Sequence, residues 1–281
     1  MIIRCHGARG SIPVSGKGYL KYGGDTTCIE IRSRNDAIIA VDAGSGIRRL
    51  GNKLLMESRF EYDILFTHSH WDHILGFPFF KPIYSEQSTI HLMGCATTQG
   101  DIQKLLSKAM SAPYFPYPFE KLKAAIHYAN DCRETFYIDS IEIRSIPLSH
   151  PNTGMGFRFT EDGRSFVFLT DNELGYRHRG GMTFEDYASF SQDADLLFHD
   201  AEFTPEEYVV KKTWGHSSCT DAVDLALAAG VRHLGLYHHN QDREDEEQDA
   251  IVERCREIIR SRGSDMRCTA VRQEEEFNLL Q

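Results

Sequence analysis

The sequence lacks the features that mark membrane-bound, secreted and nucleic-acid-coating proteins. No apolar run approaches the roughly 20 residues that a membrane helix needs, and the apolar start MII is far too short for a secretory signal peptide. Acidic residues outnumber basic ones, 41 to 31, so the net charge of −10 disfavours a broad electrostatic grip on a nucleic-acid backbone. The negative net charge does not exclude a small anionic ligand, because a bound metal can dominate the local charge. We therefore expect a cytoplasmic chain that does not contact a membrane.

Cysteine is scarce and irregularly placed. The sequence has no CxxC pair, and an odd, dispersed set of cysteines is typical of free thiols in a reducing compartment rather than of a disulfide framework. The seven cysteines are Cys5, Cys28, Cys95, Cys132, Cys219, Cys255 and Cys268.

Linkers, repeats and low-complexity tracts are also missing from the 281 residues. A chain of this length and ordinary globular composition can bury one substantial core. Short β-branched runs, such as residues 62–67, predict strands. An amphipathic pattern predicts a helix after Ser45, and an acidic helix is expected from about 243 to 262, followed by a last strand at 266–271. Strands come first in bulk and helices then interleave with them, which favours helix layers outside packed sheets, in one domain.

Metal-binding side chains crowd into one short stretch of the sequence. The six residues HSHWDH, from His68 to His73, contain three histidines and an aspartate directly after a predicted strand. Histidine and carboxylate side chains are ligands for zinc, manganese and iron. A turn at the end of a strand can aim His68 and His70 at one ion, and Asp72 and His73 at a neighbouring one. The alternative is a polar loop whose histidines cap backbone groups, and four such side chains in six residues argue against it.

This stretch matches the HxHxDH signature of the metallo-β-lactamase superfamily. The order of the later motifs is similar to that of its phosphodiesterase branch, which includes ribonuclease Z and the PhnP-type cyclic phosphodiesterases. The resemblance implies a four-layer αβ/βα sandwich, of the α+β or α/β class, with the metals at one edge between the sheets. We expect a single hydrolase domain over residues 1–281. The motifs that carry the resemblance are GARGSIP, YGGDTTCIEI, VDAGSG, FTHSHWDHILG, PLSHPNTG, FLTDNE, HDAEFTPEEY, WGHSS and LYHHN.

The resemblance also implies a set of ligands for two divalent ions. Zinc is the favoured metal, with manganese and iron as alternatives, because histidine and aspartate sites accept all three. For the last ligand position, His238 and His239 are both candidates. The family position favours His238, and alternation along a strand would point His239 the other way. Asp42 matches a structural aspartate that supports the ligand loop. The implied ligands are His68, His70 and His150 for the first ion, Asp72, His73 and His238 for the second, and Asp171 as a bridge.

Two neighbouring ions make a bridging hydroxide available and clamp the phosphoryl oxygens during an in-line displacement. In ribonuclease Z and its relatives, a histidine in an H-S-T motif is thought to protonate the leaving oxygen, oriented by an acid in an H-E-A-T-like motif. The motifs WGHSS and HDAEFTPEEY match these, so the resemblance makes His216 the proton donor and Asp200 its partner. Asp72 completes the expected catalytic set. Without the matching order of motifs, His216 would be read as a residue at the start of a helix.

The expected reaction is hydrolysis of a small phosphodiester, such as a cyclic nucleotide. The sequence lacks the Gly- and Lys-rich arm with which long ribonuclease Z grips transfer RNA, and the chain is acidic. The alternatives are a transfer-RNA 3′-end nuclease and a non-catalytic metal-binding sensor. The complete ligand set argues against the sensor.

Further expectations concern the surroundings of the site. The aromatic, proline-rich segment 107–122 either forms a lid over the substrate or packs on the core. Arg9 and Lys17, in the Gly-rich first loop, are candidate ligands for the substrate phosphate. We expect a homodimer, since dimers are the commonest oligomers.

Overall fold

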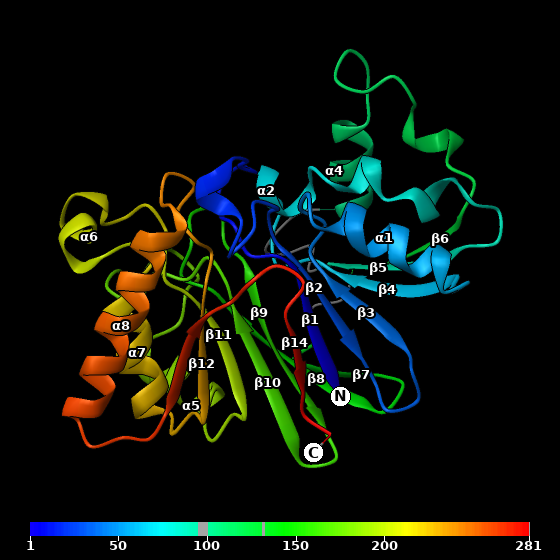
Figure 1. Ribbon diagram of the computed structural model, residues 1–281. Helices are drawn as coiled ribbons and strands as arrows, with labels where there is room; N and C mark the ends of the chain where they lie inside the picture. The colour runs from blue at the N-terminus through cyan, green and yellow to red at the C-terminus, as the bar shows by residue number, and fades with distance from the viewer. Residues whose placement is uncertain (95–100, 131–132, 281) are drawn as a thin grey trace.

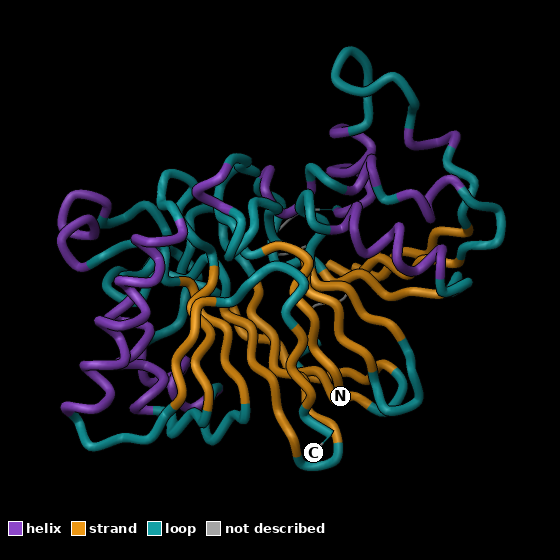
Figure 2. Tube along the Cα trace, viewed as in Figure 1, coloured by secondary structure: helices purple, strands orange, loops and turns teal. Residues whose placement is uncertain are grey.

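Two mixed β-sheets pack face to face, and helices cover their outer sides (Figure 1; Figure 2). The computed structural model describes residues 1–94, 101–130 and 133–280. Its buried apolar side chains form three clusters: one between the sheets, and one beneath the helices of each outer layer. The predicted four-layer αβ/βα sandwich is therefore confirmed.

The first sheet runs in the order β14-β1-β2-β3-β4-β5-β6. Its pairs are antiparallel from β14 to β3 and parallel from β3 to β6. Its strands are β1 (Ile2–Gly7), β2 (Cys28–Arg32), β3 (Ile38–Val41), β4 (Glu61–Leu65), β5 (Thr89–Gly94), β6 (Ala125–Asn130) and β14 (Glu276–Asn278). The helical elements of this half are η1 (Lys17–Tyr19), α1 (Ile47–Met56), α2 (Trp71–Ile74), η2 (Phe77–Phe79), η3 (Lys81–Tyr84), α4 (Ile102–Ala109) and η4 (Phe119–Lys121).

The second sheet runs in the order β13-β12-β11-β10-β9-β8-β7. Its pairs are antiparallel from β7 to β10 and parallel from β10 to β13. Its strands are β7 (Thr135–Ile138), β8 (Ile141–Pro147), β9 (Met155–Glu161), β10 (Arg164–Leu169), β11 (Leu196–Asp200), β12 (His233–Tyr237) and β13 (Arg267–Ala270). The helices α5 (Phe184–Phe190), α7 (Cys219–Ala228) and α8 (Asp245–Ser261) pack on its outer side, and α6 (Pro205–Lys211) stands out from the sandwich (Figure 1).

The prediction that the strand at 266–271 is the last one in the chain is wrong. The strand itself forms, as β13, but the chain crosses to the other sheet and adds β14, which pairs antiparallel with β1. β14 has only three residues and none of them is fully buried. It is therefore too short for an alternation of apolar and polar residues to be detected in the sequence.

The described cysteines are all free thiols in the interior. Cys5, Cys28, Cys219, Cys255 and Cys268 are buried and free, while Cys95 and Cys132 lie outside the described residues. Among the helices of residues 1–94, 101–130 and 133–280, none combines the length and the apolar character needed to cross a membrane.

The topology brings the ends of several strands to one edge of the sandwich. β3 and β4 are parallel neighbours, as are β10, β11 and β12, so within each sheet their carboxyl ends point the same way. Polar residues lie at these ends or within three residues of them, where side chains no longer have to fill the core. These residues are Asp42 after β3, His68 after β4, Asp171 after β10, Asp200 at the end of β11 and His238 after β12.

The aromatic core between the sheets gives a stability prediction. Phe198 is fully buried, and its ring lies 4.9 Å from that of Phe166 and 5.2 Å from that of Phe277, between centroids. We expect Phe198→Ala to lower the free energy of unfolding by about 3–5 kcal/mol, because it removes these contacts and leaves a cavity. Urea denaturation measures the change. The matched control is Tyr137→Ala, at a ring that is 66% exposed, which should change stability by less than about 0.5 kcal/mol; equal losses would contradict the packing argument.

Candidate dinuclear metal centre

The HSHWDH stretch forms the turn between β4 and α2. His68 and His70 lie in the turn, and His70 is the extended residue that precedes the helix. Asp72 and His73 are buried within the single turn of α2, while Trp71 is 65% exposed. The tight turn thus directs four candidate ligands inward and one aromatic ring outward.

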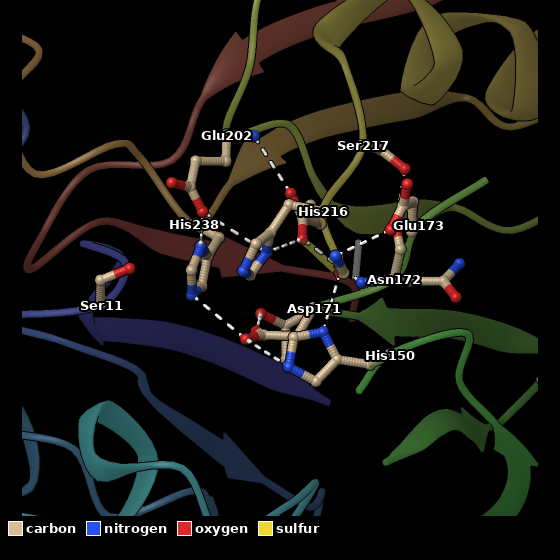
Figure 3. A network of polar contacts seen from close by, with 12 residues as sticks. Ser11, His150, Asp171, Asn172, Glu173, Glu202, His216, Ser217 and His238 are labelled. Carbon is tan, nitrogen blue, oxygen red and sulfur yellow. Dashed lines mark hydrogen bonds and ion pairs between the residues drawn. The ribbon is translucent and has the colours of Figure 1, made fainter. Parts of the chain in front are cut away.

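Two groups of ligand atoms meet at this edge. In each group, one ligand atom from every residue lies within 4.8 Å of the others, and Asp171 belongs to both. Its Oδ2 is 3.3 Å from Nε2 of His238 (Figure 3) and 3.5 Å from Nε2 of His68. Its Oδ1 is 3.3 Å from Nε2 of His73. The groups are His68, His70, His150 and Asp171, and Asp72, His73, Asp171 and His238, so the structure brings together all seven predicted ligands.

The donor atoms of these groups suit cations. Nε2 of His68 and Nε2 of His73 are buried and have no hydrogen-bond partner among the described residues. Burial holds the pKa of His68 well below its usual range, so the imidazole is neutral, which is the form that binds metals. Burial alone would lower the pKa of His73 too, but the carboxylates of Asp171 and Asp72 outweigh it and raise that pKa well above its usual range. Two divalent cations would balance this negative charge, so the residues fit a dinuclear site.

The far nitrogen of each of three histidines is fixed by an acceptor. Nδ1 of His73 donates to Asp42 (2.8 Å), Nδ1 of His150 to the carbonyl oxygen of Gly215 (2.8 Å), and Nδ1 of His238 faces a carboxylate oxygen of Glu202 (3.1 Å). Such contacts set the tautomer and leave Nε2 free to bind a metal. Asp42 also accepts from the backbone N–H and the hydroxyl of Thr67, both at 2.7 Å, and so holds the start of the ligand turn.

Three residues of the centre have left-handed backbone conformations. Asp42, Asp171 and His238, each directly after or near a strand end, have φ values of 63°, 52° and 58°. This conformation is uncommon for residues other than glycine and is often found where function needs a side chain aimed in a particular direction. Gly10 contributes from the first loop, because a Cβ there would lie 2.3 Å from Nδ1 of the His238 ring.

The choice between the two neighbouring histidines is settled by direction. His238 points into the centre, whereas Nε2 of His239 donates to the carbonyl oxygen of Val271 at 2.8 Å on the other side. The structure therefore brings His238 to the other candidate ligands and turns His239 away.

His216 lies beside the metal groups, as the motif order predicts. Its Nδ1 is 2.6 Å from Oδ2 of Asp200. Its ring is stacked on that of His238 at a centroid distance of 4.6 Å. Burial alone would lower the pKa of His216, but the carboxylates of Glu202 and Asp200 outweigh it and raise the pKa to about 9. The two carboxylates thus favour the protonated imidazole.

Glu202 is a residue of the centre that the sequence did not reveal. One of its oxygens is 3.1 Å from Nδ1 of His238 and 3.4 Å from Nδ1 of His216, so it links a candidate ligand to the candidate proton donor (Figure 3). A signal was present: Glu202 follows Asp200 by two residues, a spacing that places side chains on the same side of an extended chain.

Glu173 is a second such residue, and it sits behind the centre. Only its place in the FLTDNE motif could have pointed to it. Its buried carboxylate accepts hydrogen bonds from the Tyr208 hydroxyl and from the backbone N–H groups of Thr213 and Gly215, each at 2.7 Å. It thereby fixes the loop that supplies both the carbonyl oxygen bonded to His150 and the following residue, His216.

Arg9 is not available as a phosphate ligand, contrary to expectation. Its side chain is only 1% exposed, and the guanidinium donates to the carbonyl oxygens of Gly23, Asn240 and Arg243, each at 3.0 Å. Arg9 therefore ties the first loop to the segment after β12. Lys17 is exposed at the start of η1.

Most aromatic rings of the segment 107–122 pack on neighbouring structure. The ring of Phe115 is 5.8 Å from that of Phe79, and the ring of Phe119 is 6.1 Å from that of Phe77. Tyr114 is the exposed exception, at 74%. Of the two alternatives for this segment, packing on the core accounts for these contacts.

The support that Asp42 gives to His73 can be tested. We expect Asp42→Asn to weaken zinc binding at one site by about 10- to 100-fold, because the amide no longer fixes the His73 tautomer. A competition titration with a chromophoric chelator measures the affinity. Asp63→Asn is the matched control, since Asp63 is a half-buried carboxyl on β4 outside the two ligand groups. Unchanged affinity in Asp42→Asn would show that Asp42 does not support the ligand.

Known proteins share this fold. Residues 38–239 match the Beta-lactamase superfamily domain. Ribonuclease Z of Haloarcula marismortui is 26% identical over 277 residues, which cover 83% of this chain and 84% of that protein. The metallo-beta-lactamase fold protein YhfI of Bacillus subtilis superposes with a TM-score of 0.72 at 17% identity, over 98% of both chains. A diphosphatase from the PhnP family superposes with a TM-score of 0.67 at 16% identity, over 99% of this chain and 97% of that one.

The matched range contains the turn from His68 to His73 as well as Asp171, His216 and His238. The predicted resemblance and fold are thus confirmed, and with them the prediction of a metal-dependent hydrolase. The chain belongs to the beta-lactamase superfamily.

Proposed function

We propose that this chain is a phosphodiesterase that uses two divalent metal ions. The observation that carries the proposal is the position of Asp171, which is shared by two complete groups of ligands, next to a His216–Asp200 pair. A single metal would need only one group, and a binding protein would need no proton donor. Relatives of the chain include ribonuclease Z and a diphosphatase of the PhnP family, which supports a phosphoester as the substrate.

Seven side chains would hold the ions. Zinc is favoured by the mixture of imidazole and carboxylate ligands, and manganese or iron would also fit. When bound, two ions activate water and offset the negative charge that develops on the phosphoryl oxygens. In this proposal His68, His70 and His150 would hold the first ion and Asp72, His73 and His238 the second, and Asp171, which belongs to both groups, would serve both ions.

Asp72 is held in place from two sides. Its Oδ2 accepts from the backbone N–H of Ser11 at 2.9 Å and lies 3.1 Å from Nε2 of His238. The first loop and the end of β12 therefore fix the carboxylate before any substrate arrives. Such fixed ligands keep the charge of the centre where the phosphoryl group must sit.

His216 would protonate the leaving oxygen. Because Nδ1 bonds to Asp200, the proton available for transfer is on Nε2, at the opposite side of the ring. Asp200 keeps the ring in this tautomer and stabilises its charged form, as a carboxylate does for a catalytic histidine in general. Protonation turns an alkoxide into a neutral leaving group and so lowers the barrier to cleavage.

The role of His216 has a direct test. We expect His216→Ala to retain about two metals per chain, by elemental analysis, and to lose about 10²- to 10⁴-fold in turnover of a poorly activated alkyl phosphodiester. The loss should be smaller for bis(p-nitrophenyl) phosphate, whose leaving group needs no proton. His127→Ala, at an exposed histidine of β6, is the control. An equal loss on both substrates would remove His216 from the role of proton donor.

Metal removal tests the use of ions in catalysis. We expect dialysis against a chelator to abolish turnover of bis(p-nitrophenyl) phosphate, and added zinc, manganese or iron to restore it. If the chain binds zinc, manganese or iron but hydrolyses the substrate with none of these metals, it would instead be a metal-binding sensor with this fold.

Two substrate classes remain candidates. The missing arm and the net charge of −10 favour a small phosphodiester such as a cyclic nucleotide. The similarity to ribonuclease Z over 83% of the chain favours the 3′ end of a transfer RNA at least as strongly.

A further inference from the structure

Glu173 joins two loops on the flank of the centre that carries His216. The first loop, residues 174–181, is attached through His178, whose Nε2 is 2.8 Å from Oε2 of Glu173. The second, residues 208–214, consists of the last turn of α6 and the loop that follows it, and is attached through the Tyr208 hydroxyl and the backbone N–H of Thr213. The two loops also touch directly, because a Cβ on Gly175 would lie 2.4 Å from the Tyr208 hydroxyl. They therefore form one continuous surface, called here the leaving-group flank.

The leaving-group flank carries basic and aromatic side chains beside two exposed valines, Val209 and Val210. Neither loop contains an acidic residue. Tyr176 and Trp214 are 43% and 58% exposed, and the Nζ of Lys211 lies 4.0 Å from the centre of the Trp214 ring. The exposed basic residues of the two loops are Arg177, Arg179 and Lys212.

Short distances place this flank next to the proton donor. The Ser149 hydroxyl donates to the carbonyl oxygen of Tyr176 at 2.7 Å, directly before the ligand His150. On the side of the other loop, the buried Phe203 is near both Lys211 and His216: its ring centre is 5.9 Å from the Lys211 Nζ and 6.0 Å from the ring of His216. Since His216 protonates the leaving oxygen, the part of the substrate that carries this oxygen would depart on this side.

The second loop is held in a strained conformation. Thr213, a β-branched residue, has a φ of 79°, which strains its backbone, whereas Gly215 has a φ of 96°, which a glycine adopts without strain. Backbone of this kind persists only where the surroundings enforce it. Glu173 does so, by accepting from the N–H groups of both residues. Trp214, between them, is thereby presented to solvent by a rigid support.

We propose that the leaving-group flank binds a single-stranded segment of a polynucleotide. The proposal rests on the proposed phosphodiesterase function and names its substrate class. Tyr176 and Trp214 stack on bases, while Arg177, Arg179 and Lys212 pair with phosphates. Exposed aromatic rings beside basic side chains are the usual means of holding single strands.

A cyclic nucleotide does not account for this surface. It has one base and one phosphate, and that phosphate must lie at the metals, so it would leave the basic residues of the flank without a partner. The net charge of −10 does not oppose a strand here, because charges more than about 8 Å away are largely screened at physiological salt. Local composition therefore outweighs the total charge of the chain.

The test compares substrates with and without a strand. The wild type and Trp214→Ala are assayed for kcat/KM on a 12-nucleotide single-stranded RNA, on cyclic AMP and on bis(p-nitrophenyl) phosphate. We expect Trp214→Ala to lower the ratio of kcat/KM for the RNA to that for bis(p-nitrophenyl) phosphate by at least about tenfold, since stacking on one base contributes on this order. Tyr137→Ala, an equally exposed aromatic ring on β7, should leave the ratio unchanged.

A charge variant tests the same surface without altering the strained loop. In Arg177→Ala/Arg179→Ala, the slope of log kcat/KM for the RNA against log salt concentration should become shallower by about 0.7 for each phosphate that no longer pairs with an arginine. Metal content and the far-ultraviolet circular dichroism spectrum establish that each variant is folded.

The outcomes separate this proposal from the one on which it rests. An unchanged RNA ratio in both variants, or a wild-type kcat/KM for cyclic AMP above that for the RNA, would overturn strand binding and leave the phosphodiesterase in place. Failure of the metal-loaded wild type to hydrolyse any of the three substrates would overturn the phosphodiesterase itself.

Discussion

The carboxylate of Asp171 is the point on which the functional edge of this protein depends. It is buried, and nitrogen atoms of His68, His73, His150 and His238 all lie within 4 Å of its oxygens. A buried carboxylate among imidazoles is costly unless charge is balanced and every polar atom has a partner. Two cations would meet both requirements at once, because they bind the unpartnered nitrogens and neutralise the acids.

Around this point the fold works as a set of fixed supports. The candidate ligands lie in α2 and in loops that follow strands of both sheets, and three of their outer nitrogens face Asp42, Glu202 and the carbonyl oxygen of Gly215. Fixing a ligand in this way costs conformational freedom before the ions or a substrate bind, which is the basis of preorganised catalysis. Glu173 also acts as a fixed support. It accepts hydrogen bonds from the loop behind His150 and His216, and this loop continues into the surface proposed to hold the substrate.

The total charge and the local surface point to different substrates, and the difference is physical. A count over the sequence treats distant acids and nearby bases alike, whereas screening limits each charge to its neighbourhood. The exposed residues of the leaving-group flank include basic and aromatic side chains, although the chain as a whole is acidic. The total charge favours a small phosphodiester as the substrate, whereas the leaving-group flank favours a single-stranded polynucleotide.

The sequence by itself was enough to predict which residues the structure brings together as candidate ligands. His68, His70, Asp72 and His73 are contiguous, and His150, Asp171 and His238 each follow an apolar strand, so pattern and motif order were enough to find them. Only the tertiary structure decided what depends on distant contacts: that His238 rather than His239 faces the ligands, that Arg9 is buried as a tie between loops, and that Glu173 and Glu202 support the histidines. A side chain's direction and its partners are set by residues far along the chain, and no local pattern records them.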